Sequence, residues 1–164
     1  MQHGVSKDGL RHSSFEARKR SHLRMTTFLN ETTMASIHKD IAIDASPADV
    51  WAAVRDFGSP HQRLVPGFVL DSRLDGDARI VTFANGTVAR ELLVDCDDAR
   101  RRLAYAVISE RIKQHSASVQ VTADGDGRAR LIWIVDVLPN EIAPYINGQM
   151  DQAALAMQKS LGRR

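Results

Sequence analysis

Residues 78–98 read ARIVTFANGTVARELLVDCDD. Two strand-like runs, 79–84 and 87–95, lie on either side of the dipeptide Asn85-Gly86. Asn-Gly is strongly favoured at the centre of a type I′ turn, because both central residues of this turn need a positive φ. The stretch therefore predicts a β-hairpin with a two-residue turn.

The second strand of this hairpin carries a carboxylate among small and apolar residues. Because side chains alternate along a strand, Glu91 shares a face with Ala89, Leu93 and Asp95. Such a charge has two explanations. Either the face lines a cavity that contains a polar group, or the charge lies at a hydrated edge and pairs with an arginine. We favour the cavity and keep the edge ion pair as the alternative.

Strand and helix signals precede the hairpin. The alternation of residues 37–43 predicts a half-buried first strand. Ser46 is then a good N-cap and Pro47 a good first helical residue, so a short helix is predicted over residues 47–56. Residues 59–65 predict a second short helical turn.

Turn residues divide the middle of the chain into a series of predicted strands, residues 68–74, 79–84, 87–95, 101–109, 115–123 and 129–138. Because the joints between them are short, successive strands must run antiparallel. Residues 141–161 place Ile142, Ile146, Met150 and Met157 at helical spacing and predict a long amphipathic helix.

This order predicts an α+β fold, in which a seven-stranded curved antiparallel sheet wraps on the long C-terminal helix and two short helices follow the first strand. The helices cannot fill the concave face of such a sheet completely, so we expect a pocket between the sheet and the long helix. Ile146, Met150 and Met157 would form its ceiling, where adaptable methionine side chains suit an apolar ligand.

Composition and charge fit a globular domain. The chain is 43% hydrophobic and 26% charged, and it has no apolar run long enough for stable membrane insertion. Residues 1–33 carry 6 Lys+Arg against 3 Asp+Glu, whereas residues 34–164 carry 16 against 17, so the domain offers no basic surface for nucleic acid. We interpret residues 1–33 as a disordered tail or as an over-extended start before Met34, with a transit peptide as the less favoured alternative.

The order of elements and several motifs resemble the START-like (SRPBCC) superfamily, whose members share a helix-grip fold. The motifs are IDASPADVW at 43–51 followed by DF at 56–57, Arg79 with NG at 85–86, ELLVD at 91–95, DDARR at 97–101, and Trp133 with Pro139. The nearest likeness is to polyketide cyclase/dehydrase-like proteins and plant abscisic-acid receptors, and it covers Ser36 to about Leu161. Leu64 departs from the tryptophan that members often carry there. The Asn85-Gly86 turn is too short for the receptors' mobile gate, so phytohormone reception is not implied.

The resemblance also implies a binding site. In related receptors the residues that match Glu91, Tyr105 and His115 line the ligand cavity. With their neighbours on the same strand faces and the helix residues, the predicted ligand-binding set is Glu91, Leu93, Tyr105, Val107, His115, Ala117, Ile146, Met150 and Met157. Glu91 and His115 are expected to suit an acid/base or hydrogen-bonding pair, and Tyr105 to donate to a ligand carbonyl.

Three hypotheses about function follow. The first is the binding of a small hydrophobic ligand, lipid-like, aromatic or polyketide-like, in residues 34–164. The second is a cyclase/aromatase-type enzyme that uses Glu91 with His115 or Tyr105 as acid and base. The third is an interaction module whose cavity has collapsed. We expect no cofactor, no metal site and a cytoplasmic location, and we leave a homodimer open. Cys96 is interpreted as a buried structural thiol, and Trp51 and Trp133 as packing residues.

Overall fold

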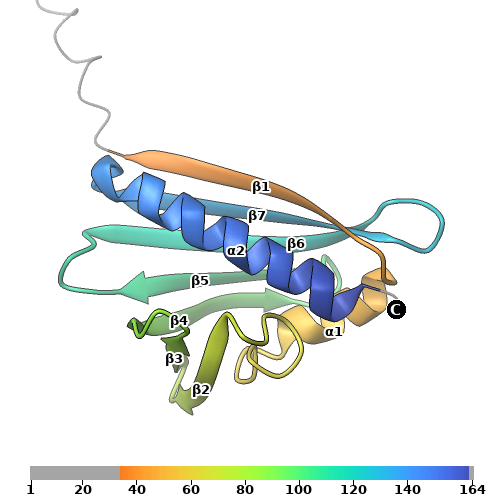
Figure 1. The fold of residues 1–164 in the computed structure, drawn as a ribbon, viewed down its shortest axis with the longest axis horizontal. Coiled ribbons are helices and arrows are strands. Elements are labelled where there is room, and N and C mark those ends of the chain that lie inside the picture. Colours follow the sequence, from red (N-terminus) through yellow and green to blue (C-terminus); the bar gives the residue numbers. More distant parts are fainter. Residues whose placement is uncertain (1–33, 163–164) are drawn as a thin grey trace, which may run out of the picture. The chain divides into compact units, whose positions relative to one another are not determined.

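The computed structural model describes residues 34–162, which lie within one compact unit. The interpretation of residues 1–33 as an extension falls outside the described residues. The strands are β1 (Ala35–Ile43), β2 (Val69–Asp75), β3 (Ala78–Phe83), β4 (Val88–Asp97), β5 (Arg102–Ile108), β6 (Gln114–Ala123) and β7 (Ala129–Leu138). They form one antiparallel sheet in the order β1-β7-β6-β5-β4-β3-β2 (Figure 1). The predicted meander is confirmed, and β1 extends the sheet by pairing with β7 at its edge.

The helices cover the concave face of this sheet. The helix α1 (Pro47–Arg55) begins as predicted, because the amide of Asp49 donates to Ser46 Oγ at 3.1 Å. The long helix α2 (Ala143–Leu161) follows a 3₁₀ turn, η1 (Asn140–Ile142), and carries its proline in the first turn, where no backbone donor is needed. In Figure 1, α2 lies diagonally across the sheet.

The second short helix after β1 is reduced to turns. Between Ser59 and Val65 the backbone hydrogen bonds are those of successive turns: Gln62 N donates to Ser59 O (3.0 Å), and Leu64 N and Val65 N both donate to Pro60 O (3.1 and 2.8 Å). No α-helix forms. Proline disfavours helical backbone at the residue before it, and prolines at 60 and 66 bracket the segment. The segment still carries Leu64 and Val65 into the core.

The hairpin between β3 and β4 has a turn of a different type from the one predicted. Phe83 N donates to Thr87 O and Gly86 N to Phe83 O, each at 2.9 Å, so the loop spans three residues. Within it only Gly86 has a positive φ, of 84°, whereas a type I′ turn would need one at Asn85 as well. The Asn85 side chain instead accepts from Thr87 N at 2.9 Å.

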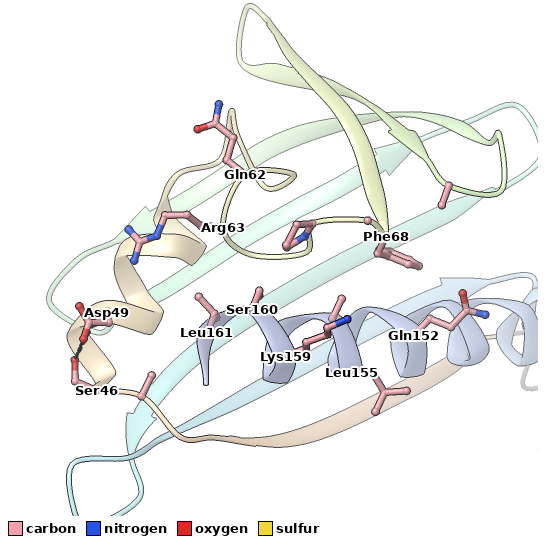
Figure 2. A pocket seen from close by; sticks show the side chains of 15 residues that line it. Ser46, Asp49, Gln62, Arg63, Phe68, Gln152, Leu155, Lys159, Ser160 and Leu161 are labelled. Atoms are coloured by element: carbon pink, nitrogen blue, oxygen red, sulfur yellow. Dashed lines mark hydrogen bonds between the residues drawn. The ribbon is translucent and has the colours of Figure 1, made fainter. Parts of the chain in front are cut away.

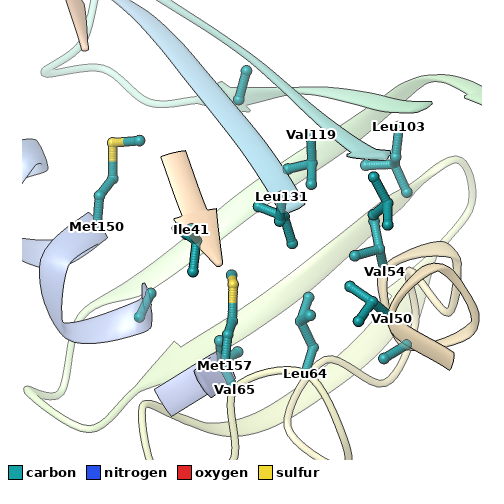
Figure 3. Close-up of a cluster of buried hydrophobic side chains, with 14 of the residues drawn as sticks. Ile41, Val50, Val54, Leu64, Val65, Leu103, Val119, Leu131, Met150 and Met157 are labelled. Atoms are coloured by element: carbon teal, nitrogen blue, oxygen red, sulfur yellow. The ribbon is translucent and has the colours of Figure 1, made fainter. Parts of the chain in front are cut away.

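The core lies between the concave face of the sheet and the helices. Figure 3 shows Val50 and Val54 of α1 facing Leu103 and Val119 of the sheet, while the α2 methionines reach in from the other side. Beyond the core, α2 is attached to β1 by an ion pair between Lys39 and Asp151. None of the helices within residues 34–162 is both long and apolar enough to cross a membrane.

Candidate functional site

A cavity of about 190 Å³ lies between the middle of the sheet, the 60–69 segment and α2. Its walls are mostly apolar. They include Val54, Leu64, Val65, Phe68, Val69, Val81, Phe83, Ala89, Leu103, Val107, Ile112, Val119, Val135, Ile146, Met150, Ala153 and Met157. The polar members of the lining are Arg79, Thr87, Glu91, Tyr105, His115, Trp133, Tyr145 and Gln149. This mixture of a continuous apolar wall and a few polar groups is typical of small-molecule sites.

A buried ion pair forms one wall of the cavity. Arg79 and Glu91 lie directly opposite each other on β3 and β4, and Arg79 Nε donates to Glu91 Oε2 at 2.7 Å. The side chains are only 11% and 7% exposed. Arg79 Nη1 also donates to the carbonyl of Phe57 at 2.8 Å, and its guanidinium lies 4.2 Å from the centre of the Phe57 ring. These contacts fix the arginine on three sides, and they compensate its charge inside the fold.

Tyr105 and His115 continue the polar groups onto β5 and β6. Both residues are buried, and their ring centres lie 6.0 Å apart. Burial raises the pKa of Tyr105, and the negative charge of Glu91 adds to that shift. Burial lowers the pKa of His115, although Glu91 acts in the opposite direction. At neutral pH the cavity therefore contains a neutral phenol and a neutral imidazole.

Two polar atoms of the lining lack hydrogen-bond partners. Within residues 34–162, His115 Nδ1 and Trp133 Nε1 are buried and form no hydrogen bond of normal geometry. Trp133 Nε1 points its donor toward the Tyr105 hydroxyl closely enough to lower the pKa of Tyr105 slightly against the effect of burial, but the two atoms do not form a hydrogen bond of normal geometry. Such unpaired atoms are uncommon in folded interiors, because a buried donor or acceptor loses its bonds to water.

The structure brings together most of the residues predicted from the sequence. Glu91, Tyr105, Val107, His115 and the three α2 residues line the cavity, and Leu93 and Ala117 do not. Ala117 is buried opposite Tyr105 but does not line the cavity. Leu93 also lies opposite Tyr105, but it is half-buried at the margin of the core.

Two further expectations about β4 are wrong. The register with β5 shifts between Leu93 and Asp95, so Asp95 pairs with Ala104 and leaves the face that Glu91 occupies. Cys96, beyond the shift, is exposed rather than buried. An extra residue in one strand reverses the facing of the residues after it, which explains why alternation failed for Asp95. The exposure of Cys96 is a separate finding, because its burial was inferred from the lack of an activating neighbour and not from alternation.

The sequence analysis missed Arg79 and Trp133 as cavity residues. Trp51, in contrast, fills the packing role predicted for it, because it is buried in the hydrophobic core and does not line the cavity. Its indole nitrogen donates to Asp98 Oδ1 at 2.8 Å. Trp133 lies on β7, where both faces are apolar, so alternation could not predict whether Trp133 faces the cavity.

A second and larger pocket, of about 1270 Å³, lies on the surface between the start of α1, the 62–68 segment and α2 (Figure 2). Its lining includes exposed side chains such as Arg63 and Leu155. Buried titratable groups are absent from this lining, so we place the candidate site in the smaller interior cavity. Phe68 lines both pockets. In the part of the chain that the structure describes, no cluster of His, Cys, Asp or Glu is arranged to hold a metal ion.

The helix-grip fold and its cavity define a START-like protein, and comparisons with known proteins give the family. Residues 34–163 match the family described as polyketide cyclase / dehydrase and lipid transport. The chain therefore belongs to this family, as its sequence motifs predicted. No curated protein shows significant sequence similarity to it.

Solved structures agree with the fold. An uncharacterised protein from Bacillus thuringiensis superposes with a TM-score of 0.70 at 19% identity, over 77% of this chain and 98% of its own. The XoxI protein from Bacillus cereus gives 0.68 at 20% identity, over 77% and 95%. Norcoclaurine synthase from Thalictrum flavum, bound to a transition-state analogue, gives 0.61 at 20% identity, over 77% and 92%. At these identities the likeness concerns the fold alone.

Proposed function

We propose that this protein binds a small hydrophobic molecule in the cavity between the sheet and α2. The observation that carries the proposal is the 190 Å³ space itself, which apolar side chains from both layers surround and which buried polar groups face. Well-packed cores leave few voids larger than a water molecule, so a space of this size is expected to be occupied or occupiable. The family description, which includes lipid transport, supports the same proposal.

Native mass spectrometry of freshly purified protein tests it first, because a co-purified molecule would appear as added mass. A cavity-filling variant, Ala153→Leu, supplies the second test. Ala153 is 1% exposed and lines the cavity, so the larger side chain takes the space of a ligand. Ala48→Leu is the matched control, since Ala48 is exposed on α1 and lines no pocket. Retention of ligand by Ala153→Leu at the level of Ala48→Leu would contradict the proposed site.

An enzyme of the cyclase/aromatase type is the second candidate. It is favoured by one observation: Glu91, Tyr105 and His115 all line the same cavity. A folded poly-keto chain needs a shaped pocket and a proton acceptor, and these side chains supply candidates for both. Turnover of a candidate poly-keto substrate by wild type and by Glu91→Gln tests this idea. Unchanged turnover in the variant removes Glu91 as the base, and no turnover in either leaves binding as the function.

The location and the partners of the protein are also proposals. The nearly balanced charges of residues 34–164 support the absence of a nucleic-acid partner. The cytoplasmic location stays a proposal that fractionation of cells would test. A homodimer stays open, and sedimentation of the purified protein decides it.

A further inference from the structure

The size of the cavity limits what it can hold. An apolar cavity of about 150 Å³ takes up benzene, whereas pockets for drug-sized ligands measure roughly 300–1,000 Å³. At about 190 Å³ the cavity matches one six-membered ring with a small substituent. Molecules with several fused rings, and long acyl chains, exceed this volume.

The charges of the lining limit the ligand further. Of the described residues that line the cavity, Arg79 and Glu91 are the two that carry a full charge, and they neutralise each other at 2.7 Å. An ionised ligand would lose its hydration without meeting an unpaired countercharge, and such burial is unfavourable. A neutral ligand avoids this cost.

The unpartnered polar atoms indicate the remaining functional group. Trp133 Nε1 can only donate a hydrogen bond, and it lies near the Tyr105 hydroxyl without forming a hydrogen bond of normal geometry, so an acceptor on the ligand would complete its bonding. His115 Nδ1 donates in one tautomer and accepts in the other, and His115 is only 8% exposed. A hydroxyl group both donates and accepts, so it suits either tautomer, whereas a carbonyl suits only one.

We propose that the ligand is a neutral single-ring molecule that carries a hydroxyl group, as phenol does. This inference rests on the proposed binding function and narrows its ligand class. The hydroxyl group forms a hydrogen bond with Trp133 Nε1 or His115 Nδ1, and the ring occupies the apolar space beneath α2.

Calorimetric titration of the wild-type protein with four probes tests the class. Phenol is the expected ligand, toluene lacks the hydroxyl, benzoate carries a charge and 2-naphthol adds a ring. Phenol is more favourably hydrated than toluene because its hydroxyl group forms hydrogen bonds with water. A cavity without a hydrogen-bonding group would therefore bind toluene more tightly than phenol. We expect phenol to bind at least as tightly as toluene, and benzoate and 2-naphthol to bind at least about tenfold more weakly than phenol.

Two variants locate the hydrogen bond. Trp133→Phe and His115→Leu each remove a polar group from the lining. We expect at least one of them to lower the affinity for phenol about 5- to 10-fold and to leave the affinity for toluene unchanged. A decrease of this size corresponds to the loss of one hydrogen bond. Trp51→Phe is the matched control, because that indole bonds to Asp98 outside the cavity. Toluene binding also reports whether each variant keeps its cavity.

The outcomes separate this inference from the function on which it rests. If 2-naphthol binds wild type more tightly than phenol, the ligand class is wrong and the binding function stands. If benzoate binds as tightly as phenol, or if neither variant changes the ratio of the phenol affinity to the toluene affinity, the proposed ligand class is also wrong. If none of these compounds binds the wild type, the proposed function itself fails.

Discussion

Substitution of Glu91 by alanine should destabilise the fold strongly, because it leaves the charge of Arg79 without its partner. The Arg79 side chain is only 11% exposed, so water cannot replace the carboxylate well. Removing one member of a buried ion pair costs about 3–5 kcal/mol of unfolding free energy. Arg79 keeps its bond to the Phe57 carbonyl and its contact with the Phe57 ring, so we expect the lower end of that range.

Thermal and urea unfolding measure this loss. For a domain of this size, 3 kcal/mol corresponds to a drop of roughly 6–12 °C in melting temperature. Asp75→Ala is the matched control, because it breaks the pair between Asp75 and Arg90, the residue next to Glu91 on β4. The side chains of that pair are 52% and 41% exposed, and exposed pairs contribute at most about 1 kcal/mol.

A double replacement separates the lost pair from lost packing. Arg79→Met with Glu91→Leu removes both charges and keeps apolar volume, so it should be much closer to wild type than Glu91→Ala is. The reasoning would be refuted if Glu91→Ala melted within 2 °C of Asp75→Ala, roughly the effect of an exposed pair. It would also fail if the double variant were less stable than the single one.

Further predictions concern His115, Tyr105 and Phe68. Because burial lowers the pKa of His115, the unfolded chain takes up a proton more readily than the folded protein, and stability should fall as the pH drops below the usual value of about 6.5. In urea unfolding, His115→Leu should flatten this fall, whereas the exposed His38→Leu should not. Because burial raises the pKa of Tyr105, stability should fall as the pH rises above about 10, and Tyr105→Phe should remove that fall. Phe68→Ala should speed ligand association several-fold in stopped-flow titration, because Phe68 lines both the surface pocket and the cavity and a smaller side chain should open a path between them; an unchanged rate would mean that ligands enter elsewhere.

Most of the fold could be predicted because its signals are local. Alternation, turn residues and an N-cap gave the strands, the meander and α1 without reference to distant contacts. The prediction of the hairpin turn type was wrong because contacts with a more distant segment accompany the observed turn. Ala84 N bonds to Phe68 O at 2.9 Å, and this bond to the start of β2 accompanies a three-residue loop. No pattern within the hairpin itself reveals that partner.

This turn also explains why Arg79 was missed as the partner of Glu91. A two-residue turn at Asn85-Gly86 would pair Ile80 with Glu91 and turn Arg79 to the outer face. The observed three-residue loop pairs Arg79 with Glu91 and Ile80 with Arg90. One residue of turn length therefore reverses the facing of all of β3, since side chains alternate along a strand. Glu91 itself lies where alternation within its own strand had placed it, because the register shift begins only after Leu93.

The ion pair also changes which residue is the better candidate for a catalytic base. If Glu91 accepted a proton from a substrate, its carboxylate would become neutral and the buried charge of Arg79 would lose its partner. The enzyme would meet this cost during the reaction, when stabilisation is needed most. His115 starts neutral with Nδ1 unpartnered, and the negative charge of Glu91 favours its protonated form. A reaction in this cavity would thus use His115 as the proton acceptor and the ion pair as a fixed polar wall. His115→Leu should then abolish turnover of a poly-keto substrate, and Glu91→Gln should retain part of it; the reverse order would return the role of base to Glu91.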